Sequence, residues 1–183
     1  MTEITGREFA NRAKSLIGLT YNQCDCIGVI CKSLGIRIQG TNWLWRSIEN
    51  SNKYRYLTNR KSVPPEGSRL QDGLVLFRIK WDVIPEGYKD KPDAHHVGVL
   101  IFENGLWSVI QSNPKTGVCL SDYHDAQWDG YGTMKNVIYN PFVDPVYQGT
   151  TNADPPLQAE PHADLSDHEM IKAIYYKLIG AGD

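Results

Sequence analysis

The residue types needed for cysteine-based nucleophilic chemistry occur at three separate places in this sequence, at Cys26, His96 and Gln111. Cys26 follows Asp25 directly and opens an apolar run at helical spacing that closes at Gly35, which predicts a short buried helix with the cysteine in its first turn. Unpaired backbone N–H groups and the positive end of the helix dipole favour a thiolate at that position. The alternative is a small buried hydrophobe, because free cysteines are among the most buried residues.

A predicted β-hairpin brings the histidine and the glutamine together. Asn104-Gly105 lies between two apolar runs, which is a strong signal for a two-residue hairpin turn, and that loop pairs Gly98 with Gln111. Side chains alternate between the faces of a strand, so His96 lies on the same face as Gln111 and within its reach. The same alternation points His95 the other way, which makes the two histidines a poor metal clamp.

These three residues together have the layout of a catalytic triad. The cysteine lies at a helix start, the histidine on a strand, and the polar side chain on the next strand. In such a triad the histidine holds and later delivers a proton, and the third residue orients the histidine ring.

The elements that must position these residues are helices in the first part of the chain and strands after it, which predicts an α+β domain. Thr5 and Glu8 form a capping box for a first helix, which Gly18 ends. Residues 36–60, rich in aromatic and basic side chains, are either a helix and loop packed on the domain or one wall of a groove for an extended polar ligand. Beyond them the sequence predicts an excursion loop at 81–93 and strands at 74–79, 96–102, 107–111, 117–120 and 136–139.

The overall composition argues against several other classes of protein. The 183 residues carry a net charge of -2 and no basic stripe, so we expect no nucleic-acid partner. No stretch approaches the roughly 18 apolar residues of a membrane span, and the first residues lack the features of a signal peptide. Three of the four cysteines lie close together, at Cys24, Cys26 and Cys31, a spacing that fits neither a disulfide framework nor a zinc site. We therefore expect no metal and no cofactor, and we expect Cys24 to be a buried thiol rather than half of a regulatory disulfide.

Composition also divides the chain into a domain at residues 1–141, a linker at 142–164 and a C-terminal amphipathic helix at 165–183. The apolar face of that last helix has to be covered, either by the main domain or through self-association with another chain. His162 and His168 have acidic neighbours, but we expect solvated side chains there rather than metal ligands.

Four short motifs surround the candidate residues: Asp25-Cys26-x-Gly28, Gly73-Leu74-Val75-Leu76-Phe77, His96-Val97-Gly98-Val99 and Val109-Ile110-Gln111. In this order, and over about residues 5 to 140, they resemble the NlpC/P60 family of cell-wall cysteine peptidases. The first looks like the family's Asp-Cys-Ser-Gly helix start, and the third looks like its His-Val-Gly-Ile strand. The second resembles the strand before the histidine, and the last falls where the family carries its third polar residue.

The resemblance implies a papain-like α+β fold, with N-terminal helices packed on an antiparallel β-sheet. It also implies hydrolysis of an amide bond in peptidoglycan stem peptides, commonly the bond between D-glutamate and the diamino acid. By carry-over, Cys26 is the nucleophile, His96 is the general base and acid, and Gln111 is the orienting residue.

The same resemblance suggests residues that bind the substrate. Asp25 matches a family position that contacts the free amino end of some substrates, and Tyr21 is a candidate for the tyrosine upstream of the cysteine. By analogy with papain-like enzymes, Gln23 and the Cys26 backbone N–H are candidates for an oxyanion hole. The family's serine after the cysteine is Ile27 here, which leaves substrate choice open.

The site of action implied is the bacterial cell wall, and the chain also resembles the compact versions found in phage and prophage lysins. Without a signal peptide, such a protein would be made in the cytoplasm. Two other functions stay open on the same scaffold. One is a different thiol enzyme, such as an N-acetylmuramoyl-L-alanine amidase or an acyltransferase. The other is a non-catalytic wall-binding or phage structural module.

Overall fold

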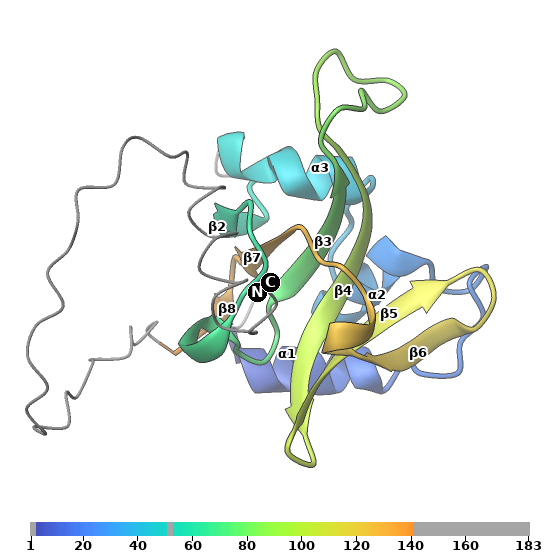
Figure 1. The fold of residues 1–183 in the computed structure, drawn as a ribbon, viewed down its shortest axis with the longest axis vertical. Coiled ribbons are helices and arrows are strands. Elements are labelled where there is room, and N and C mark those ends of the chain that lie inside the picture. Colours follow the sequence, from blue (N-terminus) through green and yellow to red (C-terminus); the bar gives the residue numbers. More distant parts are fainter. Residues whose placement is uncertain (1–2, 51–52, 141–183) are drawn as a thin grey trace, which may run out of the picture. The chain divides into compact units, whose positions relative to one another are not determined.

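The computed structural model describes residues 3–50 and 53–140, which form an α+β arrangement of helices and an antiparallel sheet, as the sequence predicts (Figure 1). The helices are α1 (Gly6–Lys14), α2 (Cys26–Leu34), α3 (Thr41–Arg46), and the short 3-10 helices η1 (Ser47–Glu49), η2 (Gly67–Arg69) and η3 (Tyr123–Asp125). In the described part of the chain, no helix is both long and apolar enough to span a bilayer. The predicted linker at 142–164 and the predicted C-terminal helix at 165–183 lie outside the described residues.

Six strands form the main sheet in the order β2-β7-β3-β4-β5-β6, and every neighbouring pair is antiparallel. They are β2 (Leu57–Lys61), β3 (Val75–Lys80), β4 (Asp93–Glu103), β5 (Leu106–Asn113), β6 (Gly117–Asp122) and β7 (Gly130–Met134). The meander from β3 to β6 and the loop before β4 agree with the sequence prediction. The short strands β1 (Ile4–Thr5) and β8 (Val137–Ile138) pair with each other in parallel, so the strand predicted at 136–139 is not part of the main sheet.

Strands β2 and β7 were not predicted. Residues 36–60 were expected to be either a packed helix and loop or one wall of a groove, and no element was expected at 130–134. The reason is local composition, because β2 is mostly polar and β7 reads Gly-Tyr-Gly-Thr-Met. Close packing requires the first of these glycines. A Cβ on Gly130 would lie 2.7 Å from the Lys61 carbonyl oxygen and 3.0 Å from the Trp45 ring. The pairing partners β2 and β3, which are far away in sequence, therefore make β7 a strand.

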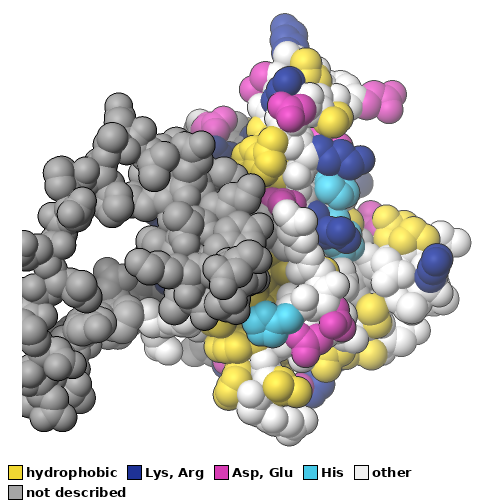
Figure 2. Space-filling view, in the orientation of Figure 1, with side chains coloured by type: hydrophobic (Ala, Val, Ile, Leu, Met, Phe, Trp, Pro, Cys, Tyr) yellow, Lys and Arg dark blue, Asp and Glu magenta, His cyan; other side chains and the backbone are white. Residues whose placement is uncertain are grey.

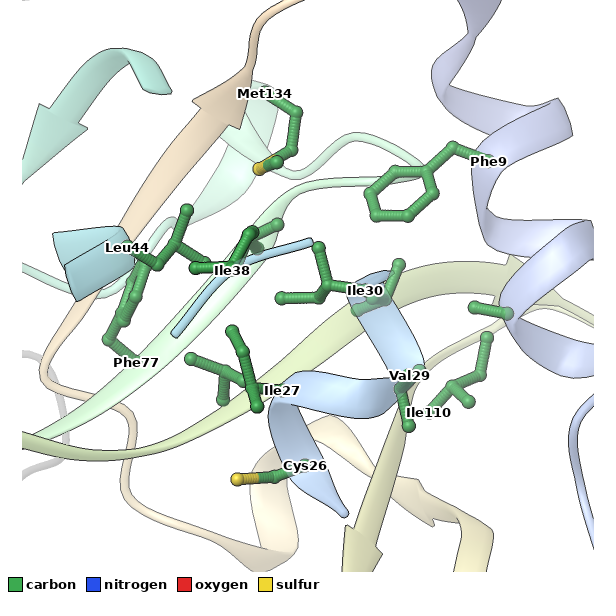
Figure 3. Packing of buried hydrophobic residues seen from close by; sticks show 14 of the residues in the cluster. Phe9, Cys26, Ile27, Val29, Ile30, Ile38, Leu44, Phe77, Ile110 and Met134 are labelled. Carbon is green, nitrogen blue, oxygen red and sulfur yellow. The ribbon is translucent and has the colours of Figure 1, made fainter. Parts of the chain in front are cut away.

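Helices α1, α2 and α3 lie on one face of the sheet, and the main hydrophobic core lies between them and the strands (Figures 1 and 3). Figure 3 shows Phe9, Ile30, Leu44 and Phe77 within this cluster, and all four are fully buried. On the opposite face, a second cluster joins Leu74, Leu76, Leu100, Val109, Tyr123, Trp128 and Tyr131. The central strands are therefore buried on both faces, which explains the continuous apolar run at 74–77.

The β4–β5 hairpin has the predicted register. Asn104 and Gly105 form the turn with φ values of 52° and 81°, a left-handed conformation that asparagine and glycine tolerate best. Gly98 lies opposite Gln111, as the two-residue loop requires.

Helix α1 begins where predicted but ends earlier. The Thr5 hydroxyl accepts a hydrogen bond from the Glu8 backbone N–H at 3.1 Å, which confirms the cap. The helix ends at Lys14 rather than near Gly18, and turns follow it. Gly18 has a φ of 97° and donates its N–H to the Val118 carbonyl, so a contact with β6 draws the chain out of the helix.

Candidate active site

The N-terminus of α2 places Cys26 at the first helical position, at the end of the core cluster (Figure 3). Asp25 is the N-cap residue, and its Oδ1 accepts a hydrogen bond from the Gly28 N–H at 2.7 Å. A larger residue at Gly28 would disturb this cap, since a Cβ there would lie 2.8 Å from the same carboxylate oxygen. The predicted position of the cysteine in the first turn is confirmed.

The start of α2 lies against both β4 and β5 at the point where these strands stop pairing. Their pairing ends at Gly98 and Gln111, and beyond it β5 pairs only with β6. Ser112, the next residue of β5, donates a hydrogen bond from its hydroxyl to the Cys24 carbonyl at 2.6 Å. On β4, the backbone of Val97 lies close enough to the Cys26 thiol to lower its pKa. The sulfur is thus held against the residue that follows His96.

The Cys26 thiol is a weak acid in this environment. Burial raises its pKa above the ordinary value of 9.0, and the Asp25 carboxylate adds to the rise. Backbone hydrogen bonds from Val97, Ile27 and Cys26 itself lower the pKa without reversing the shift. The N–H groups at the helix start therefore act in the expected direction, but burial outweighs them and the net shift favours the thiol. Ionising Cys26 near neutral pH needs a base.

His96, Gln111 and Ser121 form a chain of hydrogen bonds across β4, β5 and β6. His96 Nε2 lies 2.7 Å from Gln111 Oε1, and Gln111 Nε2 donates to the Ser121 hydroxyl at 2.7 Å. Because an amide oxygen only accepts, Nε2 of the imidazole carries the proton and Nδ1 keeps its lone pair. The Ser121 hydroxyl donates in turn to the Val109 carbonyl at 3.4 Å, which favours this orientation of the amide. The predicted contact between His96 and Gln111 is confirmed.

Trp128 and Gly98 set the position of the imidazole ring. The Trp128 ring stacks on His96, with centroids 6.0 Å apart and an interplanar angle of 19°. A Cβ on Gly98 would lie 2.4 Å from Val109 Cγ1 and 3.1 Å from the Trp128 ring, so only glycine leaves both side chains in place. Burial lowers the pKa of His96 below its ordinary value of 6.5, the Gln111 hydrogen bond raises it, and the charges of Arg78 and His95 lower it further. The imidazole is therefore neutral near pH 7 and can accept a proton.

His95 does not follow simple strand alternation. The register between β3 and β4 shifts at this point, from Arg78 opposite His96 to Ile79 opposite Ala94, which leaves His95 without a partner in β3. As a result, Ala94 and Val97 both pack in the helix-side core although they are three residues apart. Strict alternation therefore does not apply across His95, whose exposed side chain takes no part in the hydrogen-bond chain of His96.

The three predicted substrate-binding residues line one shallow pocket beside the start of α2. Its volume is about 410 Å³, and its lining residues are Tyr21, Asn22, Gln23, Cys24, Asp25 and Gly28. Burial raises the pKa of Tyr21, and the charges of Cys26 and Asp25 raise it further, so its hydroxyl lies within range of both groups. The Gln23 side-chain oxygen accepts hydrogen bonds from the Thr20 N–H at 2.9 Å and the Thr20 hydroxyl at 3.0 Å. This leaves the Gln23 amide N–H groups as the donors that it can offer.

Two residues of the site, Ser121 and Trp128, were missed from the sequence. The turn after β5 contains the signal for Ser121, because it pairs Gln111 with Cys119 and thus puts Ser121 two residues further along β6. Trp128 has no such local signal, since it reaches His96 from an irregular segment beyond η3.

The fold and the site together define an α+β protein with a buried thiol at the start of α2 and, on the strand β4 against which α2 packs, an imidazole oriented by a chain of hydrogen bonds. Among the described residues, no group of three or more His, Cys, Asp or Glu side chains is arranged to hold a metal ion. No family model matches the chain, and no curated protein or solved structure matches it either.

Proposed function

We propose that this protein is a cysteine endopeptidase of the NlpC/P60 type, with a papain-like fold, that acts at the bacterial cell wall. Its substrates would be peptidoglycan stem peptides, cut between D-glutamate and the diamino acid. The observation that carries the proposal is the 2.7 Å contact between His96 on β4 and Gln111 on β5. The backbone of Val97, the residue after His96, also lowers the pKa of the Cys26 thiol. In this proposal Cys26 is the nucleophile, His96 the base and Gln111 the orienting group.

In this mechanism His96 Nδ1 accepts the Cys26 proton as the sulfur attacks the carbonyl carbon of the scissile amide. A C–S bond forms and the carbonyl π electrons move to oxygen, giving an oxyanion. The imidazolium then gives its proton to the leaving amine as the C–N bond breaks. Water, deprotonated by His96, next attacks the thioester carbonyl, and the thiolate leaves and recovers its proton.

Three further groups have roles in this proposal. The Cys26 backbone N–H and the Gln23 side-chain amide would donate to the oxyanion. Asp25 would bind the free amino end of the substrate. Within the described residues only its Oδ1 is used, for the cap of α2, so Oδ2 remains for an ammonium group. Tyr21 would lie along the same pocket.

Mass spectrometry of reaction products tests the proposal. Wild-type protein, Cys26→Ala and Cys31→Ala are incubated with peptidoglycan sacculi and with defined stem peptides. Cys31 is a matched control, because it lies on the same helix and burial raises the pKa of its thiol too. We expect a new fragment ending at D-glutamate from the wild type and from Cys31→Ala, and none from Cys26→Ala.

The burial of Cys26 favours one second candidate, a non-catalytic wall-binding module. That function would be indicated if the wild-type protein sediments with sacculi but releases nothing from them. Fragments released equally by the wild type and by Cys26→Ala would remove the thiol from the mechanism.

A further inference from the structure

Arg78 on β3 lies directly opposite His96 on β4, so both side chains leave the sheet on the same face. The Arg78 side chain is exposed, and within residues 3–50 and 53–140 no hydrogen bond or ion pair holds its guanidinium. On the face seen in Figure 2, histidine and Lys or Arg side chains lie next to one another. A cation without a counter-charge therefore lies beside the proposed base.

Four other arginines of the domain are ion-paired, whereas Arg37, Arg55 and Arg69, like Arg78, form no ion pair within the described residues. Arg7, Arg12, Arg46 and Arg60 each form an ion pair with a carboxylate. The charge of Arg78 instead acts on His96, where it lowers the pKa and so opposes the imidazolium that the proposed reaction must form. A cation in this position works against catalysis unless a bound ligand supplies the missing negative charge.

We propose that Arg78 determines specificity by binding a carboxylate of the substrate next to the scissile bond. This inference rests on the proposed function. Where D-glutamate is joined to the diamino acid through its side-chain carboxyl, its main-chain carboxylate stays free and lies close to the amide that is cut. A guanidinium matches a carboxylate with two parallel hydrogen bonds, whereas an amide in the same place offers one acceptor and no charge. The preferred substrate is therefore the acidic form of the peptide, not the form amidated at that carboxylate.

The test compares two synthetic stem peptides that differ only there, one with D-glutamate and one with D-isoglutamine. Their kcat/KM values are measured with the wild type, Arg78→Gln, Arg78→Lys and Lys80→Gln. Lys80 is the matched control, because it is the next exposed cation on the same face of β3. Loss of a charged hydrogen-bond partner should cost the acidic peptide about 10- to 100-fold in Arg78→Gln. The amidated peptide should be cut at the wild-type rate or faster, because a charge that opposes the imidazolium is gone. Arg78→Lys should fall in between, and Lys80→Gln should keep the wild-type preference.

Two further measurements separate binding from a structural effect. Calorimetry in the Cys26→Ala background should show weaker binding of the acidic peptide when Arg78→Gln is added. An NMR titration should show a higher pKa of His96 in Arg78→Gln than in the wild type, because a neighbouring positive charge is gone.

The outcomes separate this inference from the proposed function. A wild type that cuts neither peptide and binds neither overturns both. A wild type that cuts both peptides equally, with Arg78→Gln unchanged or equally impaired on both, keeps the proposed function and overturns the role of Arg78.

Discussion

Replacing Ser121 with alanine tests whether the hydrogen-bond chain across three strands sets the protonation of His96. The Ser121 hydroxyl accepts from Gln111 Nε2 at 2.7 Å and holds the amide with its oxygen toward His96. Without the hydroxyl, the amide gains nothing from this orientation and can turn its NH₂ group toward the ring. His96 Nε2 would then accept and Nδ1 would carry the proton, a tautomer that cannot take the Cys26 proton at Nδ1.

The size of the effect follows from the bond that is lost. A neutral hydrogen bond contributes about 1 kcal/mol net, which corresponds to roughly 5-fold in rate. We expect kcat of Ser121→Ala to fall about 5-fold with KM unchanged, because Ser121 acts through Gln111 rather than on the substrate. Ser108→Ala, which removes a hydroxyl from the neighbouring strand β5, should leave kcat unchanged.

Steady-state kinetics of the double variant tests whether Ser121 acts only through Gln111. If Ser121 acts only through Gln111, then Gln111→Ala with Ser121→Ala should be no slower than Gln111→Ala alone. Independent, additive losses in the double variant would refute this reasoning, as would a Ser121→Ala enzyme as fast as the wild type. NMR of the His96 ring nitrogens gives a second readout, since a change of tautomer exchanges the protonated and unprotonated nitrogen signals.

Two other predictions concern the surroundings of His96. Because burial lowers its pKa, kcat/KM should rise with pH along a limb whose midpoint lies below 6.5. At a pH between the lowered pKa of His96 and the ordinary value of 6.5, the unfolded chain binds more protons than the folded protein. The free energy of unfolding should therefore fall as the pH drops below 6.5. Urea denaturation from about pH 8 to 5 checks this. An equal pH dependence of stability in His96→Gln would contradict it. Gly98→Ala places a Cβ 2.4 Å from Val109 Cγ1 and 3.1 Å from the Trp128 ring, so it should lower the stability by about 1–3 kcal/mol and reduce kcat by displacing Trp128 from His96. Gly40→Ala, which meets no atom within 4 Å, is the control, and denaturation curves that coincide for the two variants would count against the packing argument.

The parts of the site that the sequence predicts are those fixed by short-range rules. Asn104-Gly105 sets the turn, the turn sets Gly98 opposite Gln111, and strand alternation then brings His96 to Gln111. Asp25 similarly marks the helix start, because an N-cap and its partner lie only three residues apart.

The features that the sequence does not predict depend on contacts between segments that are distant in the chain. Strand β7 has glycines where a local pattern would need apolar side chains, and it exists through its pairing with β2 and β3. Burial of Cys26 by β4 and β5 reverses the expected direction of its pKa shift. Neither the formation of β7 nor the pKa shift of Cys26 can be derived from the neighbouring residues in the sequence.

The two pKa shifts together describe how the proposed enzyme would be switched on by its substrate. A raised pKa at Cys26 and a lowered pKa at His96 both favour the neutral thiol and neutral imidazole over the ion pair. Gln111 orients the ring through a dipole and adds no negative charge, so nothing at that position offsets Arg78. A substrate carboxylate bound to Arg78 would cancel the charge that opposes the imidazolium, at the moment when the scissile amide reaches the sulfur. On the proposed function, the same group would therefore serve recognition and proton transfer. The acidic peptide should then gain in kcat as well as in KM over its amidated form, and a gain confined to KM would show that Arg78 contributes binding alone.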